Sequence, residues 1–226
     1  MRVITSTSRV SGNQSSGEGD YSLDHNKRFS GSQEVLIQGG LYRTSGIMTV
    51  FISLIRGINV GGRKRVGMAD LVQLCQSLGF TNVRTYLRSG NVLFESPHGN
   101  PGQLSAMIGE KMSREFGFPV KVILRTSEEL RCIIANNPLA KEGLEADKLH
   151  VAFLSGIPPE AFPENMMKGH DGPDRYVIAA REVYLSCPNG YGRTKFSTSF
   201  FEKELGVAAT TRNWKTVTTL AGMAEG

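Results

Sequence analysis

The sequence holds few of the residues from which metal centres and disulfide frameworks are built. Its 226 residues include only 3 Cys and 4 His. The cysteines, Cys75, Cys132 and Cys187, lie far apart, and there is neither a C-x-x-C motif nor a pair of histidines at metal-ligand spacing. An odd number of cysteines argues against a disulfide framework. We therefore expect no metal site and no disulfide. The residues do not show whether the protein uses a cofactor, which stays unknown at this point.

Long apolar runs are also missing. No stretch approaches the roughly 18 apolar residues of a membrane-spanning helix. The N-terminal region has no apolar segment of signal-peptide length. A membrane protein and a secreted protein are both disfavoured, and we expect the chain to be cytoplasmic.

Groups suited to acid–base or nucleophilic catalysis are scarce. His25 lies in the N-terminal region, His98 and His170 lie in expected loops, and His150 falls within an expected strand, where a structural role is the simpler reading. Ser89 lacks the G-x-S-x-G pattern of a nucleophile elbow. Whether the chain is an enzyme stays open at this point.

Residues 1–47 differ in composition from the rest of the chain. They contain nine Ser and seven Gly and only scattered hydrophobic residues such as Val35, Leu36 and Ile37. So little apolar surface cannot offset the ordering entropy, and we expect a disordered leader or N-terminal extension. Its origin is open between a transit peptide, which its acid-free first sixteen residues favour, and an upstream start codon or added extension. We expect the folded part to begin at Met48.

From Met48 onward the hydrophobic pattern predicts an α+β fold. A buried strand at 49–55 is followed by a glycine-rich loop and a helix ending at Gly79. A strand pair around Ser89–Asn91, a helix ending near Phe116 and a strand at 120–124 complete a β-α-β-β-α-β order. This order predicts a first subdomain over residues 48–125.

The second half, residues 126–226, repeats the same order with one more helix. A helix is expected from Thr126, with a capping box to Glu129, and another after the cap Asn213. The remaining expected elements are strands at 149–154, 176–180, 183–186 and 207–211 and helices at 159–167 and 194–205. Both halves are therefore expected to be α-β plaits, with an extra C-terminal helix in the second. The similar segments Ile55–Ile58 and Leu154–Ile157 hint at a duplication.

Four polar loops are not explained by helix or strand periodicity. They are Arg56–Arg65, Arg88–Asn91, Pro188–Lys195 and Thr210–Trp214. Glycines allow the backbone to approach a ligand, and cations at a helix start favour an anion. Each loop also has a structural reading, as a solvated connection, a hairpin turn or a helix cap. The first loop matches neither the phosphate loop nor the dinucleotide-binding pattern.

These motifs together resemble a known family. The segments LIRGINVGG (54–62), TYLRSGNVLF (85–94), PNGYGRTK (188–195) and ATTRNWKTV (209–217) are similar to the signatures of the mainly bacterial, uncharacterised domain of unknown function 1697 family. The resemblance extends from Met48 to about Ala224. It implies two ferredoxin-like subdomains, which agrees with the pattern of elements, and it implies no activity, cofactor or catalytic residue.

The leading hypothesis is a protein that binds a nucleotide, another phosphate-bearing metabolite or nucleic acid. The formal net charge of +5 permits a polyanion partner without requiring one. The expected polar contacts, all on the four loops, are Arg56, Asn59, Arg63, Lys64, Asn189, Tyr191, Arg193, Lys195 and Arg212. Two alternatives remain: an enzyme for a small anionic metabolite with Tyr191 or His150 as proton donor, and an oligomeric or structural module without a ligand. The oligomeric state is not indicated.

Overall fold

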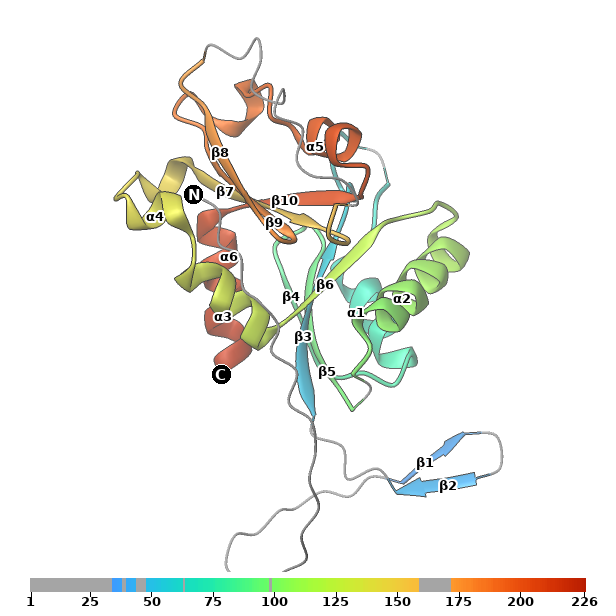
Figure 1. The fold of residues 1–226 in the computed structure, drawn as a ribbon. Coiled ribbons are helices and arrows are strands. Elements are labelled where there is room, and N and C mark those ends of the chain that lie inside the picture. Colours follow the sequence, from blue (N-terminus) through green and yellow to red (C-terminus); the bar gives the residue numbers. More distant parts are fainter. Residues whose placement is uncertain (1–33, 38–39, 44–47, 63, 98, 159–171) are drawn as a thin grey trace, which may run out of the picture. The chain divides into compact units, whose positions relative to one another are not determined.

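The computed structural model describes residues 34–37, 40–43, 48–62, 64–97, 99–158 and 172–226 (Figure 1). The chain divides into two units, Met1–Thr44 and Ser45–Gly226. In the first unit, β1 (Glu34–Ile37) pairs antiparallel with β2 (Gly40–Arg43). Both strands lie within residues 1–47, for which the sequence predicts a disordered leader or N-terminal extension, and that assignment stays a prediction. Their β-branched and aromatic residues favour an extended backbone.

The second unit begins with a four-stranded antiparallel sheet. Its strands are β3 (Thr49–Ile55), β4 (Thr81–Tyr86), β5 (Asn91–Ser96) and β6 (Val122–Thr126), in the order β4-β5-β3-β6. Helix α1 (Met68–Ser77) joins β3 to β4, and α2 (Pro101–Phe116) joins β5 to β6. Asn100 caps α2, Pro101 occupies its first turn, and Gly117 ends it in a left-handed conformation.

The second sheet repeats this topology. Its strands are β7 (Leu149–Leu154), β8 (Arg175–Ala179), β9 (Glu182–Ser186) and β10 (Ala209–Asn213), in the order β8-β9-β7-β10. In both sheets the first strand in sequence lies between the third and the fourth, and every neighbouring pair is antiparallel. Helix α5 (Thr198–Leu205) joins β9 to β10.

One further helix follows the fourth strand of each sheet. Helix α3 (Ser127–Ala135) starts at the expected capping box, in which Thr126 and Glu129 exchange hydrogen bonds. Helix α6 (Trp214–Glu225) starts at the expected cap, where the Asn213 side chain accepts a hydrogen bond from Thr216 N at 2.7 Å. The connection between the halves also contains α4 (Pro138–Lys141) and a 3-10 turn, η1 (Ala146–Lys148), which the sequence pattern did not predict.

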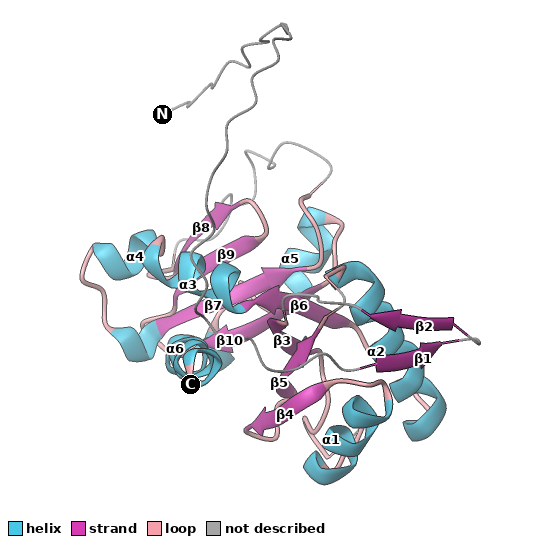
Figure 2. Ribbon diagram, turned by 90° about the horizontal axis from the view of Figure 1, so that it is seen from below, coloured by secondary structure: helices cyan, strands magenta, loops and turns pink. Residues whose placement is uncertain are grey.

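The described residues of the second unit form three hydrophobic cores, of which one joins the two sheets. The first lies between α1, α2 and one face of the first sheet and includes Phe51 and Phe94, and the third lies between α5 and one face of the second sheet and includes Phe201. The middle core joins the remaining faces of both sheets to α3 and α6, with Ile52, Val151 and other buried residues in contact. Figures 1 and 2 show α3 and α6 side by side at the junction of the sheets. Folding of either half is thus linked to the other through this shared core.

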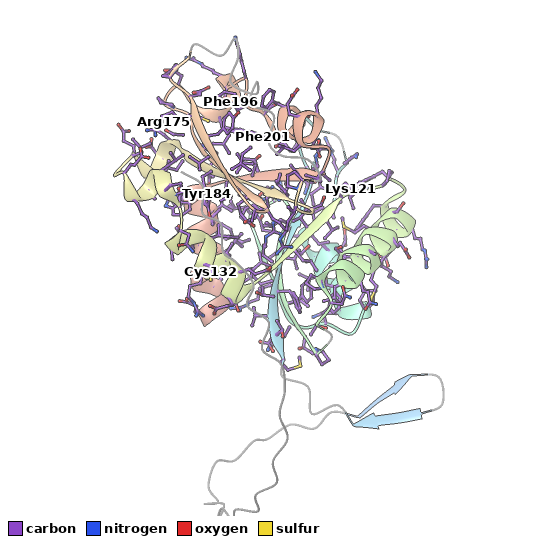
Figure 3. The ribbon with its side chains drawn as sticks, in the orientation of Figure 1. Lys121, Cys132, Arg175, Tyr184, Phe196 and Phe201 are labelled. Carbon is purple, nitrogen blue, oxygen red and sulfur yellow. The ribbon has the colours of Figure 1, made fainter. Side chains whose placement is uncertain are left out.

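Two labelled side chains show how the second sheet is covered on its two faces. Figure 3 shows Phe201 on α5, and its ring packs against Tyr176 of β8 with centroids 5.5 Å apart. On the opposite face, the Tyr184 hydroxyl donates to the Ile133 carbonyl of α3 at 3.2 Å. The sheet is therefore buried on both faces.

Two helix predictions in the second half need comment. Helix α5 begins at Thr198, not at Thr194, because Ser197 supplies the cap by accepting from Phe200 N at 3.2 Å, and residues 191–193 form a separate 3-10 turn, η2. The helix expected at 159–167 lies outside the described residues. No helix in the described part of the chain is long and apolar enough to cross a membrane.

Candidate functional site

The loop after β3 is closed by one asparagine. Asn59 has a positive φ of 56°. Its Oδ1 accepts from Val66 N at 2.9 Å, and its Nδ2 donates to the Val66 carbonyl at 3.0 Å and to the Arg88 carbonyl at 2.9 Å. All hydrogen-bonding atoms of this amide are thus engaged, and the side chain ties the loop to the turn between β4 and β5. The first two predicted loops therefore meet.

Close packing joins the same two segments on their buried side. Gly90 has a φ of 79°, and a Cβ added there would lie 2.9 Å from both Ile55 Cβ and Ile58 Cδ1. The Ile55 amide donates to the Gly90 carbonyl at 2.8 Å. Only glycine fits this approach, because both the backbone conformation and the space exclude a larger residue.

A pocket of about 660 Å³ opens where the loop and the turn meet the start of α1. Its lining comes from the loop, the first residue of α1 and the turn, and consists of Asn59, Gly62, Arg65, Val66, Gly67, Met68 and Arg88. Gly67 is the N-cap of α1 and offers no side-chain cap. The N-terminus of this ten-residue helix therefore lies at the pocket without a side chain that caps its N–H groups, and Asp70 is the acid of its first turn.

The charges around the pocket are mainly positive. Arg65 and Arg88 are exposed, and neither forms an ion pair with any residue that the structure describes. One acid opposes them: the Asp70 carboxylate lies so close to Gly67 that an added Cβ would sit 2.5 Å from its Oδ2. Two guanidinium groups against one carboxylate leave an excess of positive charge at the pocket.

Lys64 and Arg56 belong to the same loop but have other partners. The Lys64 ammonium donates to the Pro119 carbonyl at 3.2 Å and lies 5.6 Å from the centre of the Phe118 ring. Arg56 Nη2 donates to Glu202 of α5 at 2.5 Å. Neither residue lines the pocket, and Arg63 lies outside the described residues.

Arg212 is buried between the two sheets, although the sequence suggested an exposed contact. Its Nε donates to Asn91 Oδ1 at 2.6 Å, and its Nη2 donates to the Ile55 carbonyl at 2.8 Å and the Ser89 carbonyl at 3.0 Å. Its Nη1 donates to the Thr210 hydroxyl and the Thr211 carbonyl. All five N–H donors of the guanidinium are used within the protein, so none is left for a ligand. Burial lowers the pKa of Arg212 to about 10.

The third loop forms a separate polar cluster on the α5 side of the second sheet. The Tyr191 hydroxyl contacts the hydroxyls of Thr198 and Thr211 at 3.1 Å each and accepts from Thr198 N at 3.0 Å. These bonds occupy the first amide of α5 and the phenol itself. The first amide of α5 is therefore not available to an anion, and the Tyr191 hydroxyl is engaged in holding the loop.

His150 packs beside this cluster. Its ring stacks on Tyr191 with centroids 4.9 Å apart, and its Nδ1 lies 3.1 Å from the Lys148 carbonyl. A backbone carbonyl only accepts, so Nδ1 carries the proton and Nε2 is the basic nitrogen. Desolvation lowers the pKa of His150, against a smaller opposing effect of that hydrogen bond.

The remaining predicted contacts do not meet at the pocket. Asn189, Arg193 and Lys195 are exposed on the third loop, and none of them lines it. The four loops thus have three roles. The first two line the pocket, and the fourth supports them because Arg212 donates to the Ile55 and Ser89 carbonyls. The third is stabilised by its own network of hydroxyl groups. The pocket cations Arg65 and Arg88 were absent from the predicted contacts, although both lie in the loops that the sequence singled out.

Metal ligands and reactive thiols do not gather in the described part of the chain. It contains no group of three His, Cys, Asp or Glu side chains that could hold a metal ion. The three cysteines are free, with Cys75 and Cys187 buried and Cys132 exposed. Figure 3 places Cys132 on α3, away from the pocket loops.

Comparison with known proteins agrees with the arrangement of the sheets. No curated protein matches the chain. The solved structure of conserved bacterial protein SP0830 from Streptococcus pneumoniae is similar, with 23% sequence identity and a TM-score of 0.60, covering 79% of this chain and 99% of that chain. At this identity the likeness concerns the fold. A family model described as "protein of unknown function (DUF1697)" matches residues 48–184, more than half of the sequence. The chain therefore belongs to the DUF1697 family.

Proposed function

We propose that the protein binds a phosphate-bearing ligand in the pocket at the start of α1. The observation that carries this proposal is the presence of Arg65 and Arg88, both exposed and without ion-pair partners among the described residues, beside an N-terminus of α1 that lacks a side-chain cap. Guanidinium groups bind phosphate oxygens through paired hydrogen bonds, and a helix N-terminus favours negative charge. Both kinds of group line the same pocket.

The size of the pocket favours a small ligand. Its volume of about 660 Å³ lies within the roughly 300–1,000 Å³ of typical small-molecule sites. A nucleotide or another phosphate-bearing metabolite of the cytoplasm is accordingly a better candidate than a long nucleic acid. The strand order of both sheets supports the ferredoxin-like description, a fold that also occurs in RNA-binding proteins, but fold analogy alone does not identify a ligand.

Binding is better supported than catalysis. Among the described residues that line the pocket there is no Asp, Glu, His, Cys or Tyr, so none of these offers a proton donor or nucleophile for a reaction there. Asp70 lies beside Gly67 and is the nearest acid that the structure places at the helix start. The proton donors considered for an enzyme, Tyr191 and His150, belong to the second sheet.

Calorimetric titration tests the proposal directly. Wild type, Arg65→Ala and Arg88→Ala are titrated with inorganic phosphate, a nucleoside monophosphate, a nucleoside triphosphate and a short RNA. Each substitution is expected to weaken phosphate binding about tenfold, because a hydrogen bond to a charged group contributes about 1.5–3 kcal/mol. Arg114→Ala is the matched control, since this exposed arginine of α2 is paired only with Glu110 at 3.6 Å.

The outcomes separate the ligand classes. Saturable binding of the phosphate compounds that both pocket variants weaken, with Arg114→Ala unchanged, supports the pocket. Binding of RNA alone, with a steep loss at higher salt, would instead indicate a nucleic-acid surface. No binding of any of the four compounds would leave the pocket without this function.

A further inference from the structure

The turn that presents Arg88 has a conformation that its own sequence does not favour. Leu87, a non-glycine residue, has a φ of 59° and is 54% exposed. A left-handed backbone is unfavourable for such a residue, and its exposed side chain offers little packing in return. The position of Arg88 must therefore be fixed by groups outside the turn.

Asn91 provides the first of these fixing contacts. This fully buried side chain donates through Nδ2 to the Tyr86 carbonyl at 2.8 Å and to the Ser89 hydroxyl at 3.0 Å. Its Oδ1 accepts from Arg212 Nε at 2.6 Å. The amide thus spans the turn and depends on the second sheet for its remaining partner.

Arg212 supplies the other contacts to both pocket segments. Its Nη2 binds the Ser89 carbonyl, one residue after Arg88, and the Ile55 carbonyl, where β3 enters the glycine-rich loop. One planar group therefore sets the spacing between the two segments that line the pocket. Thr210 orients the guanidinium by accepting from Nη1 at 2.8 Å.

Arg125 makes the equivalent contacts in the opposite direction. From β6 of the first sheet, its Nη2 donates to the Leu154 carbonyl at 2.9 Å and to the Arg181 carbonyl at 3.1 Å. Its Nε binds Glu182 Oε1 at 2.9 Å, whereas the corresponding partner of Arg212 is the neutral Asn91. Arg125 thus holds the β8–β9 turn, which does not line the pocket.

We propose that Arg212 is the positioning residue of the anion pocket, acting from the second sheet through Asn91 and the Ser89 carbonyl to hold Arg88 in place. This role rests on the proposed function and assigns to the second half of the chain the control of a site in the first half. Arg212 itself touches no ligand, because its donors are all engaged within the protein.

The experiment compares Arg212→Lys with the matched variant Arg125→Lys. Lysine keeps the charge at each position but cannot form the planar fork of hydrogen bonds. Phosphate affinity is measured by calorimetry well below the melting temperature of each variant. Arg212→Lys is expected to weaken inorganic phosphate binding about fivefold or more, with Arg125→Lys within twofold of wild type. Thr210→Val, which loosens the same guanidinium without removing it, covers the case in which Arg212→Lys does not fold.

Two further readouts separate positioning from general destabilisation. Amide hydrogen exchange is followed without ligand at Ile55, which donates to Gly90, and at its equivalent Leu154, which donates to Arg181. Arg212→Lys is expected to speed exchange mainly at Ile55, and Arg125→Lys mainly at Leu154. In NMR spectra, the phosphate-induced shift of the Arg88 Nε–H signal is expected to shrink only in the Arg212 and Thr210 variants.

The possible results are distinguishable. Phosphate binding that both lysine variants weaken equally, or that neither weakens, would overturn the positioning role and leave the pocket standing. Phosphate binding that is undetectable in wild type would overturn the proposed function and, with it, the positioning role, even if exchange at Ile55 responds as expected. A selective loss in the Arg212 and Thr210 variants, with the selective exchange pattern, supports both.

Discussion

Arg125 and Arg212 occupy equivalent positions in the two sheets, and each crosses to the other. Arg125 is in register with Ile52 on β3, and Arg212 is in register with Val151 on β7. Each guanidinium reaches the carbonyl at the end of the first strand of the opposite sheet. This reciprocal exchange, together with the shared core, makes the two halves interdependent.

The reciprocal contacts of Arg125 and Arg212 predict one cooperative unfolding transition for the second unit. They also predict a large loss in the free energy of unfolding when either arginine is removed. Arg125→Ala leaves the largely buried Glu182 without its partner, and Arg212→Ala removes the donor of five hydrogen bonds, three of them buried. Each substitution should lower the free energy of unfolding by about 3 kcal/mol. Denaturant unfolding measures the effect, with the exposed Arg131→Ala expected within about 0.5 kcal/mol of wild type. A negligible effect of both buried substitutions on the free energy of unfolding would contradict the interdependence of the two halves.

Glycine at position 90 is expected to be irreplaceable for steric reasons. Gly90→Ala should cost more than Gly117→Ala, because both positions have positive φ, but only at Gly90 would the new Cβ meet other atoms. The control should cost about 1 kcal/mol, and Gly90→Ala at least about 2 kcal/mol. Thermal unfolding compares them, and equal losses would show that packing between Gly90 and Ile58 is unimportant.

The cysteines should differ in reactivity. Burial raises the pKa of Cys75 to about 12 and that of Cys187 to about 11, while Cys132 is exposed. Since the thiolate is the reactive form, a disulfide reagent at pH 8 should modify one thiol in the folded protein and three in denaturant. Rapid modification of a second thiol without denaturant would contradict the burial of Cys75 and Cys187.

Because the pKa values of Cys75 and Cys187 are raised, the free energy of unfolding should fall as the pH rises above about 9. An unfolded thiol loses its proton near its ordinary value of 9, whereas the buried thiols keep theirs to about 11 or 12. The contribution of these thiols is therefore fully present below about pH 9 and is lost as the pH rises toward 12. Unfolding free energies of wild type and Cys75→Ala should differ less at pH 10.5 than at pH 8. A constant difference would argue against a buried neutral thiol.

Local signals in the sequence were sufficient for the order of the strands in the two sheets, for helices α1, α2, α3, α5 and α6, and for the caps at Thr126 and Asn213, but not for α4 and the 3-10 turns. They were insufficient at Arg212, because its partners Ile55 and Ser89 lie 157 and 123 positions away in the chain. From the sequence alone, a cation in a polar loop is expected to be exposed. The burial of Arg212 follows only from the way in which the two sheets pack against each other. The division at 125 and 126 stays a proposal, since the shared core joins residues from both sides of that boundary.

The candidate site was only partly predictable for the same physical reason. The glycines and cations of the first loop indicated an anion, and the structure does place Arg65 with Arg88 at one pocket. The third loop has a similar composition, but at the start of α5 the Thr198 amide donates to the Tyr191 hydroxyl and the Phe200 amide donates to the Ser197 hydroxyl. Composition reports which donors exist, whereas tertiary contacts decide which of them remain free.

The most direct test of the proposed phosphate site is to locate a bound anion in the wild-type protein. Inorganic phosphate is added to isotopically labelled protein, and backbone and arginine side-chain NMR signals are followed. A phosphate site at the start of α1 predicts saturable shifts at Gly62, Gly67, Met68 and the Arg65 and Arg88 Nε–H groups. Shifts centred on Arg193 and Lys195, or no saturable shift at all, would contradict a phosphate site at the start of α1.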